Sequence, residues 1–138
     1  MQPPTPPQPE REAFTVQDVL AAMNASRTEN RLPALTLAPG LSAAARLKLA
    51  DMQKRGYSGH VDPDGKLVWP LVKQAGCRYR AAAENLASGY TDARKMEQDW
   101  MRSPVHRDNI LNRGFGVAGV ALSQRPPAAV VLFADSCG

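Results

Sequence analysis

The chain has 138 residues, with 17 Lys and Arg, 13 Asp and Glu, a net charge of +4 and 43% hydrophobic residues. This length fits one domain with a substantial core, and no apolar run reaches the roughly 18 residues of a membrane helix. Basic residues are interleaved with acidic ones, and no ladder of aromatic and basic side chains is present. We therefore expect no nucleic-acid binding.

The first 13 residues differ in composition from the rest of the chain. The stretch of residues 2–9 holds five of the 12 prolines and nothing suited to a core. Such stretches are extended spacers. We expect a Pro-rich flexible segment over residues 1–13 and one folded domain over residues 14–138. No apolar signal-peptide core follows Met1, so we expect any export signal to be absent from this chain.

The first half of the domain predicts two long helices. The first spans Phe14 to about Arg31, with Thr15 as N-cap and Asp18 completing a capping box. The second begins near Pro39 and runs through Lys54, where the following glycine would end it. An irregular segment with a Pro-Asp-Gly turn then covers residues 57–65.

The second half predicts shorter elements and late strands. Residues 67–75 have a short helical pattern, and residues 81–89 are a strand or an extended segment. Thr91 is the expected cap of the next helix, and Ser103-Pro104 is typical of a further helix start. Two β runs, residues 115–122 and 129–134, follow. Helices before a late hairpin indicate an α+β layered domain.

Three residues could carry chemistry: His60, Glu84 and His106. Imidazole titrates near neutral pH and is the commonest metal ligand. If the fold gathers these residues, they could bind a divalent metal or move protons. Alternatively, the histidines only hydrogen-bond each other, Glu84 and water. Asp62 could orient His60 from an outer shell, or cap the turn before Pro63.

A serine-based site is also conceivable, because Ser103, His106 and Glu84 would complete a Ser-His-acid set. We disfavour it because a helix N-cap serine engages its hydroxyl with backbone amides, and no Gly-x-Ser-x-Gly elbow surrounds Ser103. Asn85 could hydrogen-bond inside the site or fix the end of a strand.

The two cysteines, Cys77 and Cys137, lie far apart in the sequence. They could form a disulfide in an oxidising compartment or remain two buried thiols. A Cys-Cys metal pair is less favoured because no CxxC spacing exists.

An ordered set of motifs resembles the CAP superfamily: cysteine-rich secretory proteins, antigen 5 and pathogenesis-related proteins. The bacterial SCP-like branch is the most similar. The resemblance covers residues 14–138. The matching motifs are Asn24 with Arg27, Leu32-Pro33-Ala34-Leu35, Tyr57-Ser58-Gly59-His60 with Pro63-Asp64-Gly65, Glu84-Asn85-Leu86, Trp100 to Leu111, and Gly116 to Gly119.

This resemblance implies a three-layer α-β-α sandwich with a central antiparallel sheet, and a cleft with two histidines and two acids. His60, Glu84 and His106 match three of those four residues. Animal and plant members carry a glutamate where this chain has Ser103, a departure common in the bacterial branch. The resemblance also implies secretion, which favours the Cys77–Cys137 disulfide.

Three functions follow as hypotheses. The first is a secreted or surface-tethered binding module, expected to be a monomer, whose cleft at His60, Glu84, His106, Ser103 and Asn85 recognises a lipid, a glycan or a cell-wall fragment. The second is a zinc-dependent hydrolase, with His60, His106 and Glu84 as metal ligands and Glu84 as general base. The third is a purely structural cluster. Zinc or another divalent metal is an optional cofactor, not needed for folding. The expected location is extracellular, periplasmic or cell-surface.

Overall fold

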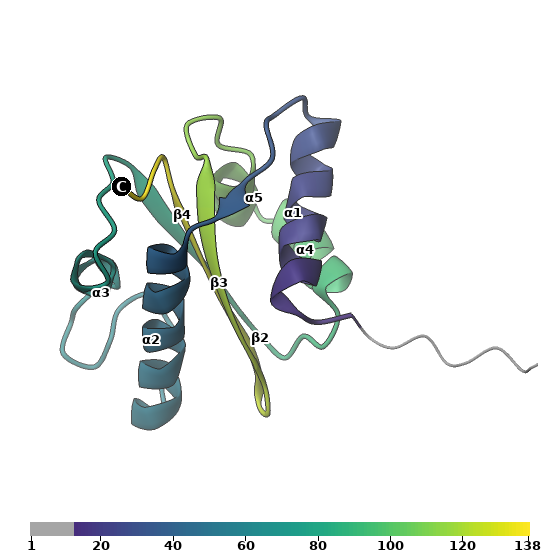
Figure 1. Ribbon diagram of the computed structural model, residues 1–138. Helices are drawn as coiled ribbons and strands as arrows, with labels where there is room; N and C mark the ends of the chain where they lie inside the picture. The colour runs from purple at the N-terminus through teal and green to yellow at the C-terminus, as the bar shows by residue number, and fades with distance from the viewer. Residues whose placement is uncertain (1–12) are drawn as a thin grey trace, which may run out of the picture.

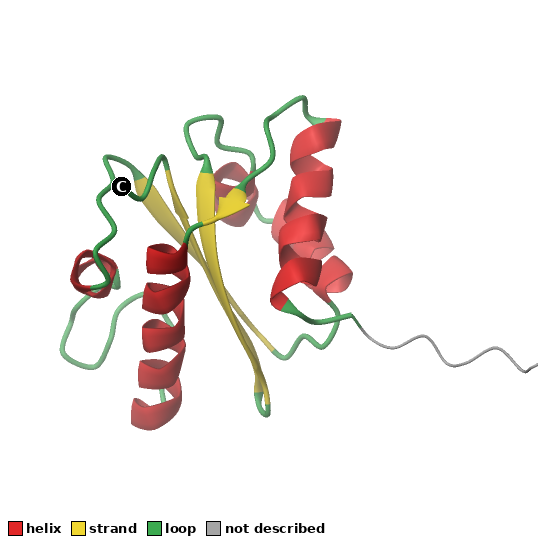
Figure 2. Ribbon diagram, in the orientation of Figure 1, coloured by secondary structure: helices red, strands yellow, loops and turns green. Residues whose placement is uncertain are grey.

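A computed structural model describes residues 13–138, so residues 1–12 of the expected Pro-rich segment lie outside the described part (Figures 1 and 2). In these residues one or two helices precede each of the first three strands, and a hairpin closes the chain. The helices are α1 Val16–Glu29, α2 Pro39–Arg55, α3 Trp69–Gln74, α4 Ala93–Met101 and α5 Pro104–Ile110. The strands are β1 Thr36–Leu37, β2 Ala82–Ser88, β3 Val117–Gln124 and β4 Pro127–Ala134.

The four strands form one sheet in the order β1-β3-β4-β2. β4 runs antiparallel to both β3 and β2, and the short β1 runs parallel to β3. The predicted antiparallel core of the sheet is confirmed, and the parallel edge strand β1 was not foreseen. This order leaves β2 at an edge, where it pairs with β4 alone.

Helices cover both faces of the sheet, as Figure 1 shows, so the predicted three-layer arrangement is confirmed. The central strand β4 packs against helices on both faces, because successive side chains of a strand point to opposite faces of the sheet. Val131 and Phe133 pack with α1, α4 and α5, whereas Val130 and Leu132 pack with α2 and α3. β4 is almost fully buried, as expected for a strand covered on both faces.

Helix ends follow local capping rules, with two corrections. Thr15 and Asp18 form the predicted capping box, and Gly56 ends α2 in the left-handed conformation, at φ 67°. The side chain that caps α4 is Asp92, which accepts a hydrogen bond from the backbone N–H of residue 94. The prediction of Thr91 as the cap is therefore wrong by one residue. The hydroxyl of Ser103 makes no capping hydrogen bond in α5, contrary to our expectation.

One glycine sets the distance between α2 and the sheet. A Cβ on Gly119 in β3 would overlap the backbone carbonyl group of Leu41 at the start of α2. Only glycine permits that approach. Beside Gly40 in the first turn of α2, the disulfide between Cys77 and Cys137 is present, as favoured above, and ties the C-terminal tail to the segment after α3.

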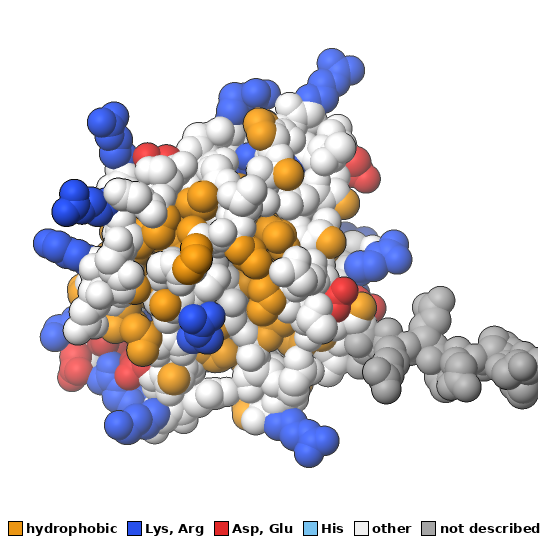
Figure 3. All heavy atoms as spheres, viewed as in Figure 1, with side chains coloured by type: hydrophobic (Ala, Val, Ile, Leu, Met, Phe, Trp, Pro, Cys, Tyr) orange, Lys and Arg blue, Asp and Glu red, His pale blue; other side chains and the backbone are white. Residues whose placement is uncertain are grey.

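Charge and apolar surface are separated on the face drawn in Figure 3. Hydrophobic side chains gather between α1 and α2, above β3, while Lys and Arg are scattered mostly around the rim. A cavity of about 390 Å³ lies there, lined by residues that include Phe14, Leu49 and Val120. In residues 13–138, no helix is both long and apolar enough to cross a membrane.

Candidate functional site

Glu84 and Asn85 are the centre of the site because β2 carries them to opposite faces of the sheet. They pair with Leu132 and Val131 of β4, and both are buried. Glu84 shares its face with Leu86, which packs with α2 and α3. The site thus occupies both sides of one edge strand.

On the first face, His60 pairs with Glu84. The imidazole Nδ1 lies 2.7 Å from the carboxylate Oε1. The His60 side chain is 51% exposed, whereas that of Glu84 is 4% exposed. Glu84 Oε2 is buried and has no hydrogen-bond partner among the described residues. Burial of a carboxylate oxygen without a partner is costly, so Glu84 is the least satisfied polar side chain of this face.

The electrostatics of Glu84 combine two opposed effects. Burial raises the pKa of this carboxyl, because a charged form is poorly solvated inside the protein. The hydrogen bond with His60 and the positive charge of Lys48 lower the pKa and partly offset burial. Glu84 is therefore a carboxyl that accepts protons more readily than an exposed glutamate.

On the second face, His106 pairs with Ser103. The hydroxyl Oγ and the imidazole Nδ1 lie 2.8 Å apart and share a hydrogen bond whose direction follows the tautomer. The ring stacks on Trp100, with 6.0 Å between centroids and 20° between planes. Burial, and then the positive charge of His60, lower the pKa of His106. The serine hydroxyl that we expected to cap α5 is instead bound to this imidazole.

Asn85 ties β2 to α5. Its Nδ2 donates to the backbone carbonyl of His106 at 3.1 Å, and its Oδ1 accepts from Asn109 at 2.8 Å. Both bonds hold the middle of β2 against α5. His60, Glu84, Asn85, Ser103 and His106 are hereafter the β2 cluster, two linked groups on either side of one strand.

The arrangement does not present a ready-made metal cage. Within residues 13–138, no three His, Cys, Asp or Glu side chains are grouped so as to hold a metal ion. Both Nδ1 atoms are engaged, that of His60 with Glu84 and that of His106 with Ser103. A three-ligand zinc set would require the imidazoles to move, so we derive no catalytic step through a metal.

Sequence reasoning missed Lys48, which is 2% exposed on α2. Its Nζ donates to the backbone carbonyl of His60 at 3.1 Å and to the hydroxyl of Tyr57 at 3.3 Å. It also lies over the Tyr57 ring, 4.9 Å from the centroid. The available signal was spacing, because Lys48 falls on the same buried stripe as Leu41 and Met52.

Arg55 fastens the segment that carries His60 to α2. Its guanidinium bonds to Asp51 of α2 at 2.9 Å and to Asp62 and Asp64 of the loop at 2.8 Å each. Asp62 also accepts from the backbone N–H of residues 64 and 66, so its turn-capping role is confirmed. The hydroxyl of Tyr57 donates to Asp51, and burial raises the pKa of Tyr57 to about 12.

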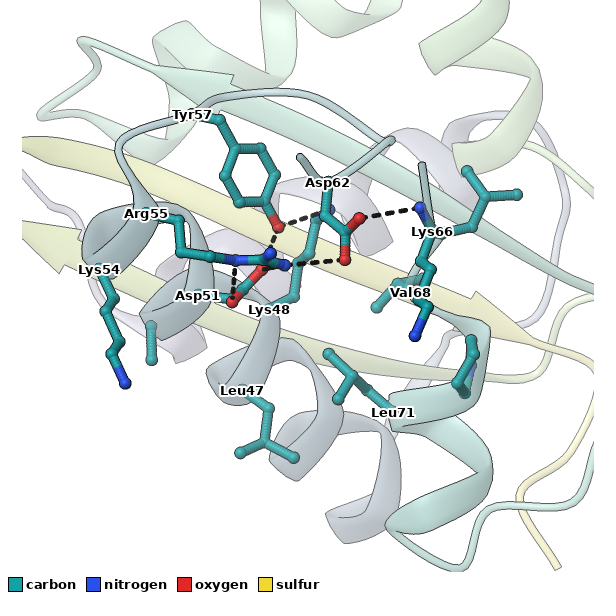
Figure 4. Close-up of a pocket in the computed structure, with 13 residues that line it drawn as sticks. Leu47, Lys48, Asp51, Lys54, Arg55, Tyr57, Asp62, Lys66, Val68 and Leu71 are labelled. Atoms are coloured by element: carbon teal, nitrogen blue, oxygen red, sulfur yellow. Dashed lines mark hydrogen bonds and ion pairs between the residues drawn. The ribbon is translucent and has the colours of Figure 1, made fainter. Parts of the chain in front are cut away.

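Figure 4 shows part of this network, Asp51, Arg55, Tyr57 and Asp62, in the wall of a cavity of about 420 Å³. Leu47 and Leu71 close the cavity from α2 and α3, and Lys54 and Lys66 lie at its edges. The cavity lies between the loop that carries His60 and the helices α2 and α3. Lys48 lines this cavity and also bonds to the backbone of His60 in the β2 cluster.

Comparison with known proteins gives consistent findings. A sequence model described as the cysteine-rich secretory protein family, CAP, matches residues 20–133. The uncharacterized protein YkwD of Bacillus subtilis (strain 168) is 35% identical over 102 residues. That match covers 74% of this chain and 40% of the relative, so the chain spans less than half of that protein.

Solved structures share the fold. An extracellular protein containing an SCP domain from Bacillus anthracis superposes with a TM-score of 0.79 at 24% identity, over 86% of this chain and 39% of that one. An outer surface protein from Borrelia burgdorferi superposes with a TM-score of 0.77 at 18% identity, over 91% of this chain and 97% of that one. At these identities the likeness concerns the fold alone.

Proposed function

The chain belongs to the cysteine-rich secretory protein (CAP) family, and on that premise we propose that it is an extracellular module that binds its ligand at the β2 cluster. The observation that carries the proposal is Glu84. Its carboxylate is buried at the sheet edge, one oxygen bound to the half-exposed His60 and the other without a partner among the described residues. A ligand would meet the half-exposed imidazole of His60, which the buried Glu84 carboxylate holds through Nδ1.

The extracellular location is part of the proposal. Two similar structures are described as an extracellular protein and an outer surface protein, and the Cys77–Cys137 disulfide suits an oxidising compartment. The periplasm or the cell surface satisfies the same conditions. The candidate ligand classes are lipids, glycans and cell-wall fragments, and we expect the protein to act as a monomer.

Three ligand preparations test the proposal: isolated cell walls, soluble glycans and anionic lipid vesicles. Retention of the wild type on one of them is compared with that of His60→Ala/His106→Ala, with Lys95→Ala as a surface control on α4. We expect the double variant to lose at least about tenfold in affinity and the control to bind as the wild type does. Equal binding by all three proteins would overturn the proposal, as would wild-type retention on none of the preparations.

A metal would enter this site as a supplement to ligand binding. The Nε2 atoms of His60 and His106 have no hydrogen-bond partner among the described residues, so each imidazole could offer one nitrogen to a metal once the two rings move toward each other. Calorimetric zinc titration of the wild type and of the double variant tests this directly. Micromolar binding that disappears in the double variant would favour the hydrolase hypothesis, and Glu84→Gln would then test for turnover.

A further inference from the structure

The free edge of β2 offers backbone groups that point away from the sheet. Two bonds frame the strand: the N–H of Asp135 donates to the carbonyl of Ala81 at 3.1 Å, and that of Gly89 to the carbonyl of Pro127 at 2.9 Å. Hydrogen-bonded positions alternate along an antiparallel pair. The odd-numbered residues therefore bond to β4, and Ala82, Glu84 and Leu86 turn their N–H and C=O outward.

Trp100 gives independent support for this direction. Its indole Nε1 donates to the carbonyl of Leu86 at 3.3 Å, which requires that carbonyl to point off the edge. Among residues 13–138, no hydrogen bond is formed by the N–H of Ala82, Glu84 or Leu86, or by the C=O of the first two. Backbone groups in a buried region rarely stay unpaired, and Glu84 is buried.

The edge lacks exposed lysine, proline and a bulge, three of the usual protections against strand pairing, and has an inward-pointing charge in Glu84. Natural edge strands carry exposed lysine, proline or a bulge. β2 has the sequence AAENLAS, without lysine or proline, and its register with β4 is unbroken. Its one charged side chain, Glu84, is buried against His60. At the start of the edge Ala81 is exposed, and Ala82 and Ala83 are half-buried.

Polar groups flank this edge on both faces. His60 lies over Glu84 on the side of α2, and His106 lies with Asn85 on the side of α5. An apolar cavity of about 390 Å³ begins at the far end of the strand, lined by residues that include Met52, Ala87 and Pro126. A chain lying along the edge would meet polar side chains first and an apolar recess next.

We propose that the free edge of β2 binds an extended peptide segment by strand addition. Only a peptide repeats N–H and C=O groups at the spacing of a strand, roughly 3.3 Å per residue; a lipid tail supplies neither group. The Pro-rich stretch of residues 2–9 is excluded as the occupant because proline has no N–H to donate. The inference rests on the proposed function in placing the ligand at β2.

The probe is a mixture of blocked pentapeptides without proline, together with the same mixture N-methylated at alternate residues. Amide hydrogen exchange of the wild type is measured with each mixture at millimolar concentration. We expect the unmodified peptides to slow exchange at Ala82, Glu84 and Leu86, and the N-methylated peptides to bind about tenfold or more weakly. Unchanged exchange at these three amides, or equal binding by both mixtures, would overturn the inference.

A matched pair of variants tests the edge from the protein side. Ala82→Pro removes one outward N–H at a strand position that tolerates proline, and Ala82→Ser keeps it. We expect peptide binding about tenfold weaker in Ala82→Pro and unchanged in Ala82→Ser. Equal binding by two folded variants would contradict the inference. If Ala82→Pro does not fold, the comparison of unmodified and N-methylated peptides on the wild type still tests strand addition.

The two proposals fail separately. If ligand retention needs His60 and His106 but peptides leave the three edge amides unprotected, the proposed function stands and strand addition falls. If peptides protect those amides while the double histidine variant retains its ligand fully, strand addition stands and the proposed function of the cluster falls.

Discussion

At the scale of single residues, the β2 cluster is held by groups that are not part of its exposed surface. Lys48 bonds to the backbone carbonyl of His60, and its charge lies near Glu84. Asn85 bonds in the same way to the backbone carbonyl of His106 from the other side. The two histidines are therefore fixed at their backbones, while the ring of His60 stays half-exposed. Such support is what a recognition site requires.

Lys48→Met is expected to destabilise the protein by about 2–3 kcal/mol, because it leaves two partly buried acceptors without their donor and removes a positive charge that acts on Glu84. The free energy of unfolding, measured by urea titration, checks this. Lys54→Met on the exposed face of α2 is the matched control, with an expected change within about 0.5 kcal/mol. Equal stability of the two variants would show that the buried ammonium contributes nothing.

The stability of the protein near pH 6 should depend on His106. Its pKa is lowered in the fold, so between that value and the usual value near 6.5 the unfolded chain binds a proton that the native state does not. Stability is therefore present above pH 6.5 and is lost as the pH falls through this window. Urea titrations at several pH values should show that the free energy of unfolding changes less with pH in His106→Gln than in the wild type. Parallel curves would refute this account of His106.

Sequence patterns predict contacts of this kind unevenly. His60, Glu84 and His106 were selected as candidates because their side chains can carry chemistry and lie in motifs that resemble those of a known family. Lys48 was not, because a lysine on a helix is usually solvated and its burial depends on the loop that folds over it. We expected the hydroxyl of Ser103 to cap the helix. It instead shares a hydrogen bond with the imidazole of His106, three residues later.

At the scale of elements, the register of α2 against the sheet decides where the site lies. α2 carries Lys48 and Arg55, which hold the segment with His60, and it approaches β3 at Gly119. Any displacement of α2 would therefore move His60 relative to Glu84. The packing of one helix and the geometry of the site are linked through this contact.

Gly119→Ala should cost about 3 kcal/mol or more, because the added Cβ would meet backbone atoms of Leu41 and Ser42 that cannot move aside individually. Gly59→Ala is the control, since its Cβ would meet nothing closer than 4.0 Å. Thermal unfolding of the two variants checks the prediction. If Gly119→Ala and the control unfold at the same temperature, α2 is free to shift away from β3.

The helices and the closing hairpin could be predicted from periodicity, capping residues and turn chemistry, because those signals are local. β1 could not, because two residues give no period and Thr36–Leu37 becomes a strand only by pairing with β3. The cap of α4 was missed because Thr91 and Asp92 are both good caps. The backbone geometry of the chain, not the sequence pattern, chooses between them.

At the scale of the whole molecule, a doubly covered sheet leaves one usable edge. β1 and β2 are the two edge strands, and β1 has two residues, whereas β2 has seven. The long edge carries the β2 cluster, and its two faces are reached from different layers, α2 on one side and α5 on the other. The order of strands thus explains why residues far apart in sequence meet at β2.

Ligand recognition at the β2 cluster can be followed directly, because the two histidines of the chain both belong to that cluster and serve as reporters. Two-dimensional imidazole NMR spectra would be recorded while a cell-wall, glycan or lipid preparation that retains the protein is added. If the ligand binds at the β2 cluster, we expect the imidazole signals of both His60 and His106 to shift in proportion to bound ligand. Bound ligand with both imidazole signals unchanged would contradict it.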